Sequence, residues 1–93
     1  SLAEGVRRLT AAPARVIGLQ DRGLLRPGMR ADVNIFDASA VQELQPEMVH
    51  DFPGGAPRFI QRAQGYKATL VNGVVSVLDG EHTGDRAGCI LRR

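Results

Sequence analysis

Residues 66–79 read YKATLVNGVVSVLD. Two runs rich in β-branched residues flank the pair Asn72-Gly73, which is the preferred sequence for a two-residue type I′ hairpin turn. That turn needs positive φ at both central residues, and asparagine and glycine adopt this conformation at low cost. The stretch therefore predicts a β-hairpin with strands at 66–71 and 74–79.

The turn also sets the register of the hairpin. Val71 pairs with Val74, and side chains alternate between the two faces of a strand pair. We therefore expect one apolar face directed at a core and one more polar face. The apolar face holds Ala68, Leu70, Val75 and Val77, and the other face holds Lys67, Thr69 and Ser76.

A further strand is predicted before the hairpin. Residues 31–37 read ADVNIFD, in which apolar and polar residues alternate with the period of a half-buried strand. The preceding residues 26–29 read RPGM, with proline and glycine at the central positions of a type II turn. After the hairpin, from residue 80, we expect an irregular tail with room for one short strand.

Two short helices are expected before residue 20. Within 2–9, apolar side chains recur at helical spacing on one side and charged residues lie opposite. Thr10 offers a hydroxyl N-cap for a second helix, Pro13 suits its first turn, and Gly18 ends it. Two N-terminal helices and several strands indicate a mainly β fold.

Residues 38–65 are the least regular part of the chain. Prolines and adjacent glycines interrupt helices and strand ladders, so we expect a long surface loop. Loops of this length are uncommon in compact domains unless they pack on something or frame a site. The interrupting residues are Pro46, Pro53, Gly54, Gly55 and Pro57.

Composition narrows the class of protein. The 93 residues form one domain, and with 4% aromatic residues its core must rest on aliphatic side chains. Twelve basic and ten acidic residues are spread along the chain, with tight basic pairs only at Arg7-Arg8 and Arg92-Arg93, so nucleic-acid binding is not indicated. Cys89 is alone, which excludes an intrachain disulfide and fits the cytoplasm. No apolar run predicts a membrane span or a signal peptide.

The start of the chain reads as the middle of a helix with no initiator methionine. We therefore expect an excised piece of a longer protein, with Ser1 left from a tag.

The histidines give little support for a catalytic or metal site. His50 and His82 are far apart and neither belongs to a pair with metal-ligand spacing, so solvated or loop-packed histidines are the favoured interpretation. A charged His50-Asp51 acid/base pair is the sharper alternative. Adjacent residues in an extended segment usually point apart, which disfavours it.

Other candidates for chemistry are equally weak. Ser39 and Ser76 lack the small-residue elbow of a catalytic serine, and the neighbours of Cys89 suit a small buried hydrophobe better than an activated thiol. Gly54-Gly55 lacks the lysine of a phosphate loop and reads as a turn. A short helix could present Arg58 and Arg62 on one side, either as a solvated face or as an ion-pair contact with a neighbouring domain.

Several of these segments, taken in order, resemble the end of the amidohydrolase superfamily, and within it the branch of D-aminoacylases (N-acyl-D-amino-acid deacylases). Asn34 departs from the family, in which that strand position is commonly apolar. The segments that carry the resemblance are LT at 9–10, PAR at 13–15, IGL at 17–19, RGLLRPG at 22–28, ADVNIFD at 31–37, the run from His50 to Tyr66, VNGVV at 71–75 and DGEHTG at 79–84.

The resemblance implies a full-length enzyme with a TIM-like barrel that binds one or two divalent metals, usually zinc, to activate water for amide hydrolysis. The family's metal ligands lie on barrel strands, and none maps onto this sequence. We therefore expect no catalytic, cofactor-binding or metal-ligating residue here. For this chain the resemblance implies a helical segment at 1–20 that leaves the barrel, and a small β-domain at 21–93. The resemblance further implies that this β-domain is a partial β-sandwich, which in such enzymes is completed by strands from the enzyme's own N-terminus.

The leading hypothesis is thus a non-catalytic C-terminal portion of a zinc-dependent hydrolase of linear amide bonds, with the missing barrel as its partner. The isolated piece, with unpaired strand edges, is expected to be inactive and to form homodimers. The alternative is a freestanding β-domain that binds a protein or ligand through residues 38–65. A minimal enzyme that uses His50 and Asp51 is the third hypothesis.

Overall fold

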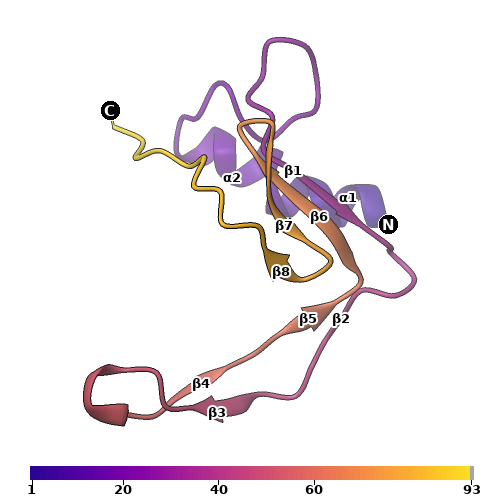
Figure 1. Cartoon of the computed structure of the whole chain (residues 1–93). Helices are drawn as coiled ribbons and strands as arrows, with labels where there is room; N and C mark the ends of the chain where they lie inside the picture. The colour runs from indigo at the N-terminus through magenta and orange to yellow at the C-terminus, as the bar shows by residue number, and fades with distance from the viewer. Residues whose placement is uncertain (93) are drawn as a thin grey trace.

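The structure, a computed structural model, describes residues 1–92, so Arg93 of the C-terminal basic pair lies outside the described residues. The chain forms two short helices followed by eight strands in three antiparallel sheets (Figure 1). In chain order the elements are α1 (Leu2–Leu9), α2 (Ala11–Val16), β1 (Val33–Phe36), β2 (Gln42–Glu43), β3 (Glu47–Val49), the 3-10 turn η1 (Pro53–Gly55), β4 (Arg58–Ile60), β5 (Ala63–Gln64), β6 (Tyr66–Val71), β7 (Val74–Leu78) and β8 (Glu81–His82).

The main sheet is built on the predicted hairpin. It has four antiparallel strands in the order β1-β6-β7-β8. Val71 pairs with Val74, and Asn72 and Gly73 have φ of 50° and 81°, as a type I′ turn requires. The hairpin is therefore confirmed.

The predicted face assignment of the hairpin is wrong beyond the first pairs. Leu70 pairs with Val75 but Thr69 pairs with Val77, so Ser76 is the extra residue of a β-bulge. Ser76 is buried at 8% exposure, and its hydroxyl donates to the carbonyl of Thr69 at 3.2 Å. The bulge moves Val77 to the face of Thr69 and turns the serine inward.

The segments before the sheet follow the sequence pattern with one correction. The hydrogen bond from Met29 N–H to the Arg26 carbonyl (3.2 Å) and φ of 89° at Gly28 confirm the type II turn. Both helices are present, but the Thr10 hydroxyl does not cap α2. It donates instead to the Val6 carbonyl one turn back, at 2.7 Å.

Residues 38–65 were expected to form a loop, and this expectation is wrong. β2 pairs with β5 and β3 pairs with β4, with η1 at the tip, to form a long two-stranded projection that we call the arm (residues 42–64). Figure 1 shows it extending away from the main sheet and from both helices. The prolines do not break the ladders, because Pro46 and Pro57 each lie immediately before a strand. Arg58 accordingly lies in β4 and not in a helix.

The chain has almost no enclosed core. Its accessible surface is 7703 Å², whereas a globular protein of its mass exposes about 5,200 Å². Its radius of gyration is 15.7 Å, compared with about 12 Å for a compact domain of this length. Among residues 1–92 only Ala14, Ala68 and Ser76 are buried. The fold is mainly β with helices at the N-terminus and open sheets, as a partial β-sandwich would be, and the division at residue 20 stays a prediction.

Candidate functional site

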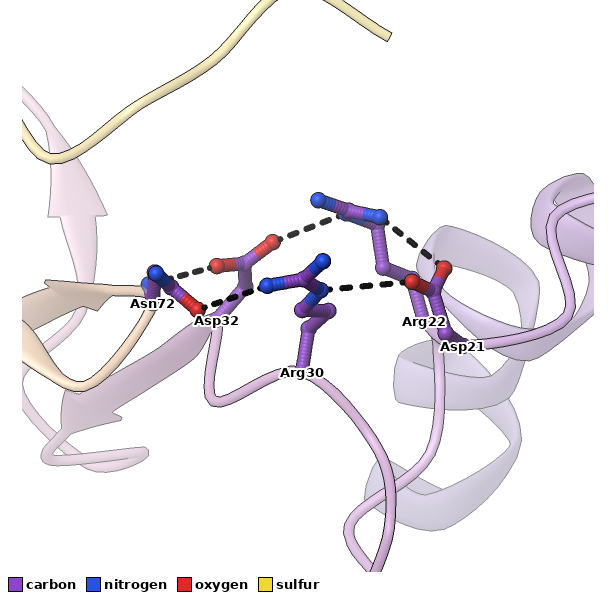
Figure 2. Close-up of polar contacts among 5 residues, drawn as sticks. All are labelled: Asp21, Arg22, Arg30, Asp32 and Asn72. Carbon is purple, nitrogen blue, oxygen red and sulfur yellow. Dashed lines mark hydrogen bonds and ion pairs between the residues drawn. The ribbon is translucent and has the colours of Figure 1, made fainter. Parts of the chain in front are cut away.

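Five polar residues join segments that are far apart in the sequence, and we call them the polar clamp (Figure 2). Arg22 is its centre, with a side chain only 19% exposed. Its Nη1 donates to Asp21 Oδ1 at 2.9 Å and its Nε to Asp32 Oδ2 at 3.1 Å. The clamp consists of Asp21, Arg22, Arg30, Asp32 and Asn72.

Asp32 connects the clamp to the hairpin turn. Its Oδ1 accepts the backbone N–H of Asn72 at 2.8 Å, and Arg30 Nη1 donates to Asn72 Oδ1 at 3.3 Å. Beside them the N–H of Gly73 donates to the Ala31 carbonyl at 2.9 Å. The turn between β6 and β7 is thereby attached to the residues that lead into β1.

The clamp leaves no net charge with which to attract a ligand. Burial raises the pKa of Asp21, but the charge of Arg22 and the hydrogen bonds from Arg30 and Arg22 outweigh it and hold that pKa below its ordinary range. Burial likewise lowers the pKa of Arg22, and the carboxylates of Asp21 and Asp32 more than reverse this. Two guanidinium groups therefore face two carboxylates. The clamp is equipped to hold segments together.

A small cavity of about 230 Å³ lies between the clamp and the C-terminal tail. It is smaller than the cavities of roughly 300–1,000 Å³ that usually bind small molecules. Its lining residues are Arg22, Arg30, Asp32, Val71, Asn72, Ala87, Gly88, Cys89 and Leu91.

A much larger apolar hollow lies between the helices and the edge of the main sheet, and we call it the trough. Its volume is about 1100 Å³ and it is open to solvent. The apolar stripe that the sequence of α1 predicts lines it, together with residues of α2 and β1 and of the segments before and after β1. The large apolar side chains of the trough are Leu2, Val6, Leu9, Ile17, Leu19, Leu24, Leu25, Val33, Phe36, Val41 and Tyr66.

The structure does not assemble the acid/base pair considered at His50 and Asp51. Both carboxylate oxygens of Asp51 accept hydrogen bonds from Arg58, each at 2.6 Å. These bonds lower the pKa of Asp51 and raise that of Arg58. His50 lies near the arm tip, whereas His82 lies in β8 of the main sheet, so the two histidines belong to different sheets.

The candidate nucleophiles have local structural partners. The Ser39 hydroxyl donates to Asp37 Oδ1 at 2.6 Å, and this bond lowers the pKa of Asp37. Ser76 is buried in the bulge. Cys89 is exposed in the tail, so its assignment as a buried hydrophobe is wrong. A tail without regular structure offers no apolar layer to cover it.

Within residues 1–92 no three or more His, Cys, Asp or Glu side chains cluster in a way that could hold a metal ion. The described residues therefore do not fit a zinc ion. Of the helices in this part of the chain, neither has the length and apolar character needed to cross a bilayer.

Sequence reasoning missed both the clamp and the openness of the trough. Arg22 and Asp32 are visible only as parts of short motifs, and nothing local pairs Asp32 with Asn72, forty residues further along. The apolar stripe of α1 can be recognised in the sequence, but whether it is exposed depends on which other part of the protein covers it.

Comparison with known proteins gives a consistent result. The sequence model described as "Amidohydrolase family" matches residues 1–77. The chain is 39% identical over 92 residues to the N-acyl-D-aspartate deacylase of Alcaligenes xylosoxydans xylosoxydans, covering 98% of this chain and 16% of that protein. It is 40% identical over 93 residues to the N-acyl-D-glutamate deacylase of the same organism, covering 100% and 17%.

A D-phenylhydantoinase of Escherichia coli O1:K1 / APEC is 36% identical over 96 residues, covering 100% of this chain and 21% of that protein. The chain thus spans about a sixth to a fifth of the length of the curated relatives it matches. No solved structure matches it significantly.

Proposed function

The chain belongs to the amidohydrolase family, and from that premise we propose that it is the non-catalytic C-terminal portion of a metal-dependent hydrolase of N-acyl-D-amino acids. The names of two relatives, deacylases of N-acyl-D-aspartate and N-acyl-D-glutamate, support this substrate class. The same names favour a linear amide over the cyclic amide that a hydantoinase opens.

The open trough is the observation that carries the structural role. An accessible surface of 7703 Å² exceeds the globular expectation by roughly 2,500 Å², which is larger than a standard protein interface. Part of this exposed surface is the trough, where large apolar side chains of α1, β1 and their neighbouring segments surround a hollow of about 1100 Å³, and a contiguous exposed apolar patch of this kind marks a contact site. The occupant we propose is the catalytic barrel of the same polypeptide, which would bury α1 and the β1 edge of the sheet.

One or two divalent metals, with zinc as our proposal, would polarise the amide carbonyl and lower the pKa of a bound water. Their ligands would come from the barrel, since the described residues of this chain form no fitting cluster. The role of this chain is to hold its segments against the barrel. The clamp serves this role because it fixes the geometry of the trough wall beside β1.

Removed from the rest of the enzyme, the chain would expose the trough and the unpaired edge of β1. We therefore propose that the isolated piece is inactive and associates into homodimers. Within the whole enzyme we propose no nucleic-acid or membrane partner and a cytoplasmic location.

The test uses the whole enzyme encoded by the gene. Release of free amino acid is measured from N-acetyl-D-aspartate, N-acetyl-D-glutamate and their L-enantiomers, before and after removal of metal by a chelator and restoration with zinc. We expect hydrolysis of the D-substrates only, loss on chelation and recovery with zinc, and no turnover by residues 1–93 alone. Ring opening of a hydantoin without deacylation would refute the substrate class, and turnover by the isolated chain would refute the non-catalytic role.

A further inference from the structure

The arm carries a second apolar surface that is separate from the trough. Met48 and Phe59 pair directly across β3 and β4, so their side chains share one face. They are 52% and 71% exposed. An isolated two-stranded hairpin is marginally stable in water. The arm therefore needs a surface against which this face can pack.

Charged side chains on the arm disfavour the pairing of another strand with its edges. The acidic residues Asp51 and Glu47 belong to one side of the arm, and each forms an ion pair with an arginine of the other side, Arg58 (2.6 Å) and Arg62 (3.5 Å). Charged side chains along a strand edge disfavour edge-to-edge pairing. A partner would therefore meet the arm through side chains on its apolar face.

The tip of the arm has a defined shape although it is exposed. The Arg58 guanidinium holds Asp51 through two hydrogen bonds and lies 5.5 Å from the centre of the Phe52 ring. Gly54 and Gly55 both have φ of 73° with open space around them, so they set the turn and do not serve packing. A side-chain surface that is already fixed loses less conformational entropy when it docks.

The apolar face of the arm is exposed, its edges carry charged side chains, and its tip has a fixed shape. We therefore propose that the Met48–Phe59 face of the arm docks on the catalytic portion of the same polypeptide. This inference rests on the proposed function. The matched relatives are roughly five to six times as long as this chain and align with it across the arm, so ample surface exists in one subunit.

Covalent linkage favours that surface over a second copy. A tethered partner acts at an effective concentration in the millimolar range, far above that of a second molecule in dilute solution. The arm also lacks strong charge with which to recruit a different partner, because both of its arginines are in ion pairs within the arm.

Methionine oxidation in the whole enzyme tests the proposal, because the chain contains only Met29 and Met48. Dilute peroxide is added to the enzyme at a protein concentration where light scattering shows a monomer. Oxidised and unoxidised methionine peptides are then quantified by mass spectrometry. We expect Met48 to oxidise at least tenfold more slowly than in the unfolded enzyme. Met29, which is half-buried as the last residue of the type II turn and lies outside the arm, reports the protection that this structure already provides.

A variant pair sharpens the result. Phe59→Ser should bring Met48 oxidation close to the unfolded rate, whereas Arg62→Ser, which removes an exposed residue with a weak 3.5 Å contact, should leave it unchanged. Fast oxidation of Met48 in the wild-type enzyme would overturn the proposal, as would protection that vanishes on dilution together with a dimer. Protected Met48 in an enzyme that lacks deacylase activity would refute the proposed function alone.

Discussion

The molecule has two regions, one that contains the clamp and one that is the arm, and different kinds of contact stabilise them. In the clamp, Asp32 and Arg30 bond to Asn72 across 40 and 42 positions of sequence. In the arm, side-chain contacts join residues no more than 18 positions apart, within a single hairpin. The first region is fixed by tertiary contacts, whereas the second depends on its own cross-strand pairs and on where it joins the sheet.

The junction of the two regions is at Gly65, where we expect the largest effect. Its φ is 90°, and a Cβ there would lie 2.6 Å from the Cα and N of Val41. Gly65→Ala combines left-handed strain with a backbone clash, and should destabilise the whole enzyme by about 3 kcal/mol. The midpoint of thermal unfolding is the measurement.

Gly84→Ala is the matched control, because Gly84 has φ of 92° and nothing within 4 Å of the added Cβ. It should cost only the backbone strain, about 1–2 kcal/mol. Equal effects of the two variants would show that the junction is not tightly packed.

A smaller effect is expected in the clamp. Asp32→Asn removes the charge that accepts from Arg22 and Asn72, and should destabilise by about 1–2 kcal/mol, as charge-assisted hydrogen bonds do. Asp79→Asn makes the same chemical change at a turn residue with φ of 48°, which asparagine tolerates, and should stay within about 0.5 kcal/mol. If Asp32→Asn is as neutral as its control in thermal unfolding, the contrast between clamp and arm fails.

The smallest effect concerns the arm and depends on pH. The hydrogen bonds from Arg58 lower the folded-state pKa of Asp51, so their contribution is present above the ordinary aspartate pKa of about 3.9. It is lost as pH falls through the lowered pKa. Amide hydrogen exchange across residues 47–60, corrected for intrinsic rates, should accelerate in that acidic window.

Asp51→Asn provides the comparison for this pH effect. The variant has no titrating carboxylate at the tip, so its exchange should be faster at neutral pH and show no acidic step. An identical acidic step in the variant would assign the titration to another group.

The two regions also differ in how far the sequence predicts them. Asn72-Gly73 and Pro27-Gly28 determine their turns through local backbone preference, and the structure confirms both. The inward turn of Ser76 comes from a bulge that local pattern does not reveal. In the arm, the sequence suggests that the prolines interrupt the hydrogen-bond ladders of the strands. In the structure they lie just outside the strands.

The expected absence of site residues stays a prediction, because it depends on which parts of the enzyme surround this chain. The clamp could not be predicted, because pairing between Asp32 and Asn72 is a property of the assembled sheet. The trough could be seen as a stripe on α1, but a sequence pattern does not tell a buried stripe from an open one.

The scarcity of buried side chains affects how this part of the enzyme unfolds. The steepness of a urea transition scales with the area newly exposed on unfolding. Since Ala14, Ala68 and Ser76 are the only buried residues among 1–92, the isolated chain has less area to expose than a compact domain of its length and should unfold over a broader range of urea concentration. If this segment shows a sharp urea transition within the whole enzyme, the cooperativity comes from the rest of the enzyme, which unfolds together with it.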